Sequence, residues 1–300
     1  PVLEPEQLDN KETWTPFVQI EAAGSPFEIG QVVGEKTRDL IVKAIEDRRD
    51  WFEDLKQFAL ADRKVRIDGF KKAIAFHHPE VLAELKGLAK GADIPLDEIL
   101  VLNFQPELGA LKSQVEADAC STFNLVSDGQ TLLVHNEDGH NAYHKRMIIL
   151  KGAPKDAPRF TTLLYPGVLA GNVPFINDAG LLMSTNFIGA KDVKIGVPRY
   201  VLGRAVLSQH TIEQAIEVAT NKDIAYSFHL NLGSVKEKRL VAVDVCTEAT
   251  DTQETKGLFL QTNHFVLPGT KHLEQIVYKA GGSSDSRYQV LAEGTKTLPP

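Results

Sequence analysis

Residues 118–139 of this 300-residue chain read DACSTFNLVSDGQTLLVHNEDG. Two runs of strand-forming residues, Ser121–Val126 and Thr131–His135, flank the dipeptide Asp128-Gly129. Asp-Gly between two such runs is typical of a two-residue turn, because both central turn positions need a positive φ angle. The segment therefore predicts a β-hairpin that brings residues 118–123 close to residues 134–139.

Cys120 lies at the open end of this hairpin. Residues that face each other across paired strands lie about 5 Å apart, so we expect Cys120 to face Asn136 and Asp138. The other cysteine, Cys246, ends the apolar run 240–246, and we interpret it as a small buried hydrophobic residue. Two cysteines give no disulfide framework, although a single bridge between them is left open.

The sequence before Cys120 is rich in helical signals. Ser25-Pro26-Phe27-Glu28 has the capping-box spacing with Pro at the first helical position, and apolar residues then recur at helical intervals. Further helices are expected from Pro79 to Gly91 and from Leu96 to Phe104. We therefore predict a helical N-terminal segment.

After Cys120, short β-type runs alternate with turn residues, and helices are expected only at 198–208 and 212–220. Sheets of this kind must be covered by helices, so the whole chain is predicted to have an α+β fold. The expected strands beyond the hairpin are Met147–Leu150, Phe160–Leu164, Gly180–Asn186, Arg239–Val245 and Leu258–Thr262.

Composition excludes several classes of partner. The net charge of −7 argues against nucleic acid or an anionic membrane as a ligand. No apolar run approaches the roughly 18 residues that a membrane span needs. The first ten residues are acidic and Pro-rich, unlike a signal peptide, which leaves a removed presequence open. Because the low cysteine count favours a reducing compartment, we expect a cytoplasmic protein. With 43% apolar residues, the chain can bury a large core.

The order of motifs resembles the acyl-coenzyme A:6-aminopenicillanic acid acyltransferase family. This is the isopenicillin N acyltransferase group of the Cys-type N-terminal-nucleophile (Ntn) hydrolases. Its nucleophile region is similar to Cys120 followed by Ser121, with a hairpin that ends in Asn136-Glu137-Asp138. Other segments resemble the family in order, namely Glu84–Ala92, Ile99–Asn103, Asn177–Leu181, Ser184–Asn186, Gly196–Arg199, Thr262–Phe265 and Ser283–Arg287.

The resemblance implies a four-layer αββα Ntn-hydrolase sandwich and a chain that cuts itself between Ala119 and Cys120. Fragments 1–119 and 120–300 would then stay associated as a heterodimer, which leaves a homo-oligomer open. The freed α-amino group of Cys120, with a reference pKa near 7.7–8.0, would act as base for its own thiol. No cofactor and no metal are expected.

The resemblance also implies residue roles. Asn263 is the leading donor to the oxyanion, and Asn186 and Asn136 are further candidates for oxyanion or substrate binding. Asp138 would hold the Cys120 amino group, and Arg287 would organise that carboxylate or one end of the substrate.

The implied activity is that of an amidohydrolase or N-acyltransferase that cleaves small, non-peptide, linear amides through a Cys thioester. Two departures from the family pattern are Ala119 in place of the common Gly, and Glu137 in place of an aromatic residue. One alternative is therefore an uncut, non-catalytic binding protein of the same fold. Another is a metallohydrolase built on His135, His140 and His144, since imidazole and carboxylate groups suit zinc or iron.

Overall fold

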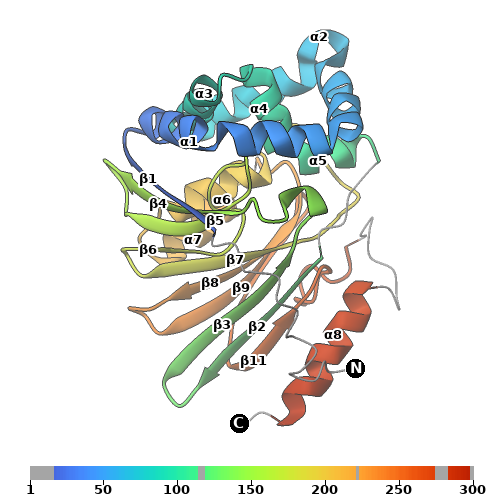
Figure 1. The fold of residues 1–300 in the computed structure, drawn as a ribbon. Coiled ribbons are helices and arrows are strands. Elements are labelled where there is room, and N and C mark those ends of the chain that lie inside the picture. Colours follow the sequence, from blue (N-terminus) through green and yellow to red (C-terminus); the bar gives the residue numbers. More distant parts are fainter. Residues whose placement is uncertain (1–16, 114–118, 221–222, 274–282, 298–300) are drawn as a thin grey trace, which may run out of the picture.

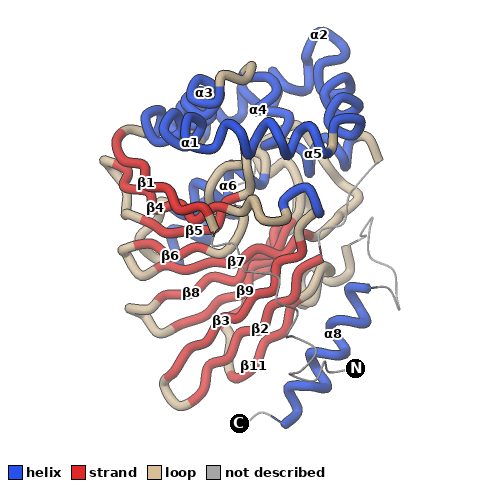
Figure 2. The backbone as a smooth tube through the Cα atoms, in the orientation of Figure 1, coloured by secondary structure: helices blue, strands red, loops and turns tan. Residues whose placement is uncertain are grey.

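The computed structural model describes residues 17–113, 119–220, 223–273 and 283–297. Two sheets form the centre of the molecule (Figures 1 and 2). The larger has eight strands, all antiparallel to their neighbours except the edge strand β1, which runs parallel to β4. In spatial order they are β1 (Val18–Gly24), β4 (Ile148–Pro154), β5 (Phe160–Leu164), β6 (Phe175–Asn177), β7 (Leu181–Phe187), β8 (Phe228–Ser234), β9 (Arg239–Val245) and β10 (Thr250–Glu254).

The smaller sheet contains the predicted hairpin. Its order is β11 (Gly257–Gln261), β2 (Ala119–Ser127) and β3 (Gln130–Asp138), all antiparallel. The turn between β2 and β3 is Asp128-Gly129, with φ angles of 50° and 73°. Both angles are positive, as a two-residue hairpin turn requires, so the hairpin prediction is confirmed.

In the described part of the chain, five helices precede the hairpin and three follow it. The capping box at Ser25 is formed: Glu28 accepts a 2.7 Å bond from the Ser25 N–H and donates its own N–H to the Ser25 hydroxyl. The bounds are α1 (Pro26–Asp47), α2 (Arg49–His77), α3 (Pro79–Ala92), α4 (Leu96–Asn103), α5 (Gln105–Leu111), α6 (Arg199–Leu207), α7 (Ile212–Ala219) and α8 (Ser283–Gly294), with short 3₁₀ turns η2 (Asn141–Tyr143) and η3 (Thr295–Thr297).

The two sheets pack face to face and helices lie outside them. Apolar residues of β8 and β9, such as Leu230 and Val243, belong to the same core cluster as residues of α6 and α7. The opposite face of β7 and β8 is polar and meets β2, where Thr122 bonds Asn186 and Asn124 bonds Asn231. Helix α8 packs on β2 and β11, outside the smaller sheet (Figure 1). The described residues thus form an α+β fold in which helices, two sheets and a helix follow one another.

The N-terminal segment is mostly helical, as predicted, but it also contains the strand β1, which the sequence did not indicate. This strand extends the large sheet by pairing with β4, from Val18 opposite Ile148 to Gly24 opposite Pro154. Residues 1–16 and 114–118 of the predicted segment 1–119 lie outside the described ranges. The main core cluster takes residues from both sides of Cys120, so the two predicted fragments share one core and one sheet. None of the described helices is both long and apolar enough to cross a membrane.

Candidate active site

The hairpin register places Glu137, and not Asn136 or Asp138, directly opposite Cys120. The two-residue turn pairs Ser127 with Gln130. Cys120 lies as many residues before Ser127 as Glu137 lies after Gln130, so these two residues also form a pair. Side chains alternate between the faces of a strand, so Asn136 and Asp138 point the other way. Both are exposed, and the Asn136 amide donates to the Asp138 carboxylate at 2.9 Å. The prediction that Cys120 faces this pair is wrong.

The Glu137 carboxylate connects three other side chains. Its Oε2 accepts from the Cys120 thiol at 3.5 Å and lies 2.8 Å from His135 Nε2. Its Oε1 accepts from the Tyr165 hydroxyl at 2.7 Å. The site is enclosed, because Cys120 is 2% exposed and the side chains of His135 and Glu137 are 2% and 17% exposed. The carboxylate is therefore fixed in direction against the sulfur atom.

Thr122 determines the orientation of the His135 ring. The Thr122 hydroxyl donates to Asn186 Oδ1 at 2.9 Å, and Asn186 Oδ1 also accepts from the Asn231 amide at 3.0 Å. The Thr122 oxygen also lies 2.7 Å from His135 Nδ1, while His135 Nε2 lies 2.8 Å from Glu137 Oε2. Both nitrogens of the ring are therefore held in place.

Asn263 holds the backbone nitrogen of Cys120. Its Oδ1 accepts from the Cys120 N–H at 2.9 Å, and its Nδ2 donates to the Phe187 carbonyl at 2.9 Å. The family resemblance implies Asp138 as the group that orients this nitrogen and Asn263 as a donor to an oxyanion. In the structure, it is Asn263 and not Asp138 that contacts the Cys120 nitrogen.

Arg287 reaches the same residues from helix α8. It donates through Nη1 to the Cys120 carbonyl and, at 3.0 Å, to the Ser121 hydroxyl, and through Nη2 to Asn263 Oδ1 at 2.7 Å. The neighbouring Ser284 hydroxyl accepts from the Asn263 N–H at 2.8 Å. Of the two roles expected for Arg287, the contact with the Asp138 carboxylate is not formed among the described residues, and the contact with one end of the substrate stays a prediction.

Asn186 lies on β7, buried beneath Thr122. Its Oδ1 accepts two hydrogen bonds, whereas its Nδ2 has no partner among the described residues. A buried amide donor without a partner is costly to a fold and is suited to a ligand acceptor. Of the amides named from the sequence, Asn186 is the one whose nitrogen makes no hydrogen bond to any of the described residues.

Sequence reasoning missed several groups of this site. Glu137 was noted only as a departure from the family, and Tyr165 and Thr122 were not singled out. Asn231 lies on β8, a strand that was not predicted, because Phe228–Ser234 mixes polar and apolar residues that are all buried. The signal that could have found Glu137 was the register of the two-residue turn.

The three-histidine metal site is not formed. His140 and His144 are exposed, and His140 Nδ1 accepts from the Ala142 N–H to cap η2. Among the described residues, the one group with metal-ligand chemistry is Cys120, His135 and Glu137, whose ligand atoms lie within 4.8 Å of one another. Both cysteines have free thiols, so the bridge left open by the sequence is absent.

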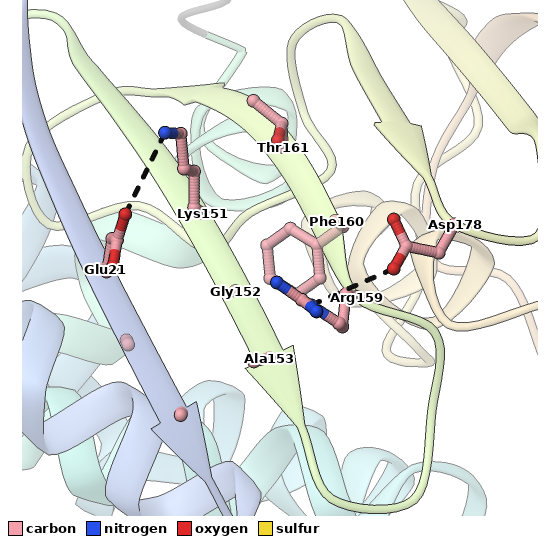
Figure 3. Close-up of a pocket in the computed structure, with 10 residues that line it drawn as sticks. Glu21, Lys151, Gly152, Ala153, Arg159, Phe160, Thr161 and Asp178 are labelled. Atoms are coloured by element: carbon pink, nitrogen blue, oxygen red, sulfur yellow. Dashed lines mark ion pairs between the residues drawn. The ribbon is translucent and has the colours of Figure 1, made fainter.

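A pocket of about 260 Å³ lies on the surface over β1, β4 and β5 (Figure 3). Two pairs of exposed charged side chains border it, Lys151 with Glu21 and Arg159 with Asp178, each 3.8 Å apart. None of the residues that surround Cys120 lines it, so it is separate from the candidate site.

Comparison with known proteins shows to which family this chain belongs. The model of the family described as acyl-coenzyme A:6-aminopenicillanic acid acyl-transferase matches residues 125–298, more than half of the chain. The chain belongs to this family. The match contains Asn186, Asn263 and Arg287 and begins shortly after Cys120. The family resemblance found in the sequence is thereby confirmed.

Relatives of this acyltransferase family include enzymes named for two activities. The 40 kDa form of acyl-coenzyme A:6-aminopenicillanic-acid-acyltransferase from Emericella nidulans is 24% identical over 257 residues, 84% of this chain and 70% of that protein. The beta-alanyl-dopamine/carcinine hydrolase of Drosophila melanogaster is 29% identical over 156 residues, 47% of this chain and 40% of that protein. The chain thus spans less than half of the hydrolase.

Among solved structures, a variant of conjugated bile acid hydrolase from Clostridium perfringens is similar over 47% of each chain, at 14% identity and a TM-score of 0.26. A likeness at this level supports no conclusion about fold or function.

Proposed function

We propose that this chain is a self-processing amidohydrolase or N-acyltransferase of the acyltransferase family, with Cys120 as its nucleophile. The observation that carries the proposal is the environment of Cys120. Its thiol contacts a fixed carboxylate and its backbone nitrogen is held by Asn263 and, through Asn263, by Arg287. The order of helices, two sheets and a helix supports the predicted four-layer Ntn-hydrolase sandwich.

Self-cleavage begins with attack of the Cys120 sulfur on the carbonyl carbon of Ala119. The bond between that carbon and the Cys120 nitrogen breaks, which leaves a thioester between Ala119 and the sulfur. Water then adds to the thioester carbon and releases the thiol, so that residue 119 ends in a carboxylate and Cys120 begins with an amine. Asn263 Oδ1 already accepts from this nitrogen and keeps the new amine at the sulfur.

The two fragments, 1–119 and 120–300, stay together as a heterodimer in this proposal. Strand β1 of the first fragment is hydrogen-bonded to β4 of the second. Glu84 on α3 and Arg204 on α6 form a buried ion pair across the same boundary, with a shortest contact of 2.8 Å. Separation would expose both a sheet edge and an unpaired buried charge, which is costly.

Turnover would use the freed amine as the base. The amine takes the thiol proton, the thiolate attacks the substrate carbonyl, and the leaving amine carries the proton away, which leaves an acyl-thioester. Asn186 Nδ2 is the proposed donor to the oxyanion, because it has no other partner among the described residues. Water completes hydrolysis, whereas an acceptor amine completes acyl transfer. The proposed substrate is an amide or acyl donor, in keeping with the names of the relatives, and its restriction to small linear amides comes from the family resemblance.

A panel of chromogenic acyl-amides tests this activity. We expect turnover by the wild type, none by Cys120→Ala, and unchanged turnover by Cys246→Ser, since Cys246 packs in a separate apolar cluster with Phe265. A wild type that turns over no amide and whose Cys120 does not react with acylating reagents would support the non-catalytic binding protein instead.

A further inference from the structure

Self-cleavage needs a proton acceptor for the Cys120 thiol other than the one proposed for turnover. Before the cut, the Cys120 nitrogen is part of a peptide bond, and it donates its hydrogen to Asn263. A peptide nitrogen has no lone pair available for a proton, so the base used in turnover does not yet exist. A thiol has an ordinary pKa near 8.5 and reacts as the thiolate, so the uncut chain needs another proton acceptor.

We propose that Glu137 accepts the Cys120 thiol proton in the uncut chain, with His135 and Tyr165 as its positioning residues. This inference rests on the proposed function and names a second catalytic group for its first step. Glu137 Oε2 is 3.5 Å from the sulfur, within hydrogen-bonding reach of a thiol. Geometry of this kind is the first requirement for a general base.

The carboxylate cannot turn away from the sulfur without losing two other bonds. Tyr165 donates to Oε1 at 2.7 Å, and His135 Nε2 lies 2.8 Å from Oε2. The His135 ring is itself fixed, because its Nδ1 bonds the Thr122 hydroxyl at 2.7 Å. Glu137 Oε2 therefore contacts the sulfur and the imidazole together, and the carboxylate is held within reach of the thiol proton.

Other charged and titratable groups around the site come from several elements. His135 lies on the same strand, Tyr165 follows β5, and Arg287 on α8 contacts the Cys120 carbonyl. Tyr143 packs on Tyr165 with ring centroids 4.7 Å apart, and Arg48 Nη1 donates to the Tyr143 hydroxyl at 3.4 Å. Of these groups, the Glu137 carboxylate is the acceptor in contact with the sulfur.

The protons and electrons balance over the cleavage step. The thiol proton moves to Glu137 Oε2 and the sulfur lone pair forms the bond to the Ala119 carbonyl carbon. When the tetrahedral intermediate collapses, the Cys120 nitrogen leaves with the bonding electrons and takes the proton from Glu137. Glu137 thus begins and ends as a carboxylate, and water later hydrolyses the thioester.

The test measures the rate of self-cleavage as a function of pH by intact mass, on chains made by cell-free synthesis. Glu137→Gln keeps the size of the side chain but removes the base. At neutral pH we expect it to cut at least about 100-fold more slowly than the wild type, the typical contribution of a general base. Its rate should then rise about tenfold per pH unit below the thiol pKa near 8.5, as solvent forms the thiolate, so that its deficit against the wild type shrinks by more than tenfold by about pH 9.

Two further measurements separate this role from a structural one. Glu137→Asp keeps a carboxylate next to the thiol, so it should cut faster than Glu137→Gln at neutral pH, whereas a merely structural role of Glu137 predicts no such rescue. Tyr165→Phe should slow cleavage less than Glu137→Gln, with the same alkaline recovery. The matched control is Glu21→Gln, an exposed carboxylate on β1, which should cut at the wild-type rate.

The possible results are distinguishable. A Glu137→Gln chain that cuts as fast as the wild type at neutral pH overturns the role of Glu137 and leaves the proposed function intact. A variant that stays slow at every pH assigns Glu137 a structural role and also overturns the inference. A wild type that stays as whole as Cys120→Ala contradicts self-processing itself.

Discussion

Replacing Glu107 with Gln should change how the stability of the fold depends on pH. Glu107 lies on α5 and is fully buried. One of its carboxylate oxygens accepts from the Arg199 N–H at 2.8 Å, and the other has no partner among the described residues. Burial raises the pKa of this carboxyl from its ordinary value of 4.5 to about 7, against the opposing effect of that hydrogen bond. The folded chain therefore favours the neutral acid.

The size and sign of the effect follow from the pKa of Glu107. The folded-state pKa lies above the unfolded one, so the contribution of Glu107 to stability is complete below about pH 4.5 and is lost as pH rises through about 7. The rise in pKa from 4.5 to about 7 corresponds to about 3 kcal/mol in the free energy of unfolding. The amide of the Glu107→Gln variant is neutral at every pH, so the variant has no such contribution to lose.

Urea unfolding of both proteins at about pH 5 and pH 8 measures the effect, in a Cys120→Ala background that keeps the chain in one piece. The free energy of unfolding of Glu107→Gln, relative to its parent, should rise by about 2.5 kcal/mol between these pH values, because a small part of the effect is already present at pH 5. Other titrating groups are common to both proteins and cancel. The exposed control Glu35→Gln should show no such rise. A difference that does not change with pH would refute the argument.

Three further changes probe the site and its frame. Glu84→Gln leaves Arg204 buried without its charged partner and should cost about 3–5 kcal/mol in thermal unfolding, whereas Lys43→Gln, on the exposed face of α1, should cost less than about 1 kcal/mol. Asn186→Ala should lower kcat for acyl-amides by about 10²–10³ with little change in KM. An increase in KM with kcat unchanged would contradict its role as oxyanion donor. Arg287→Lys loses the planar fork that joins Asn263 to the Cys120 carbonyl and should slow self-cleavage and turnover together; rates equal to the wild type would show that the fork is unnecessary.

Much of the fold could be predicted because its signals are local. The turn Asp128-Gly129 has the φ angles that its residue types favour, and the Ser25 capping box forms as its spacing indicates. Helix α3 extends one residue beyond the expected end at Gly91, because Asp93 adopts the left-handed conformation that terminates it. Such details depend on a few neighbouring residues, which a sequence displays directly.

The rest depends on contacts between distant segments. Strand β1 is a strand because it pairs with β4, more than a hundred residues later, and no local pattern reports that pairing. Strand β8 is buried on both faces, so its polar side chains do not alternate in the manner of a half-exposed strand. The contact of Asn263 with the Cys120 nitrogen likewise joins segments 143 residues apart.

The position of Glu137 was missed for a different reason. Its position opposite Cys120 was contained in the sequence, because a two-residue turn fixes the register of every later pair. A register shift of one residue moves every side chain to the other face of its strand. The expectation that Asn136 and Asp138 face the thiol was based on a register that differs by one residue from the observed one. Register must therefore be counted from the turn before residues are assigned to a site.

The most direct test of the central claim is the intact mass of the purified chain beside that of Cys120→Ala. Self-processing predicts two fragments for the wild type, divided between Ala119 and Cys120, that elute together under native conditions. The variant should give a single full-length mass. A folded wild type that remains one full-length chain under the same conditions would contradict the account, because only the cut supplies Cys120 with a free amine.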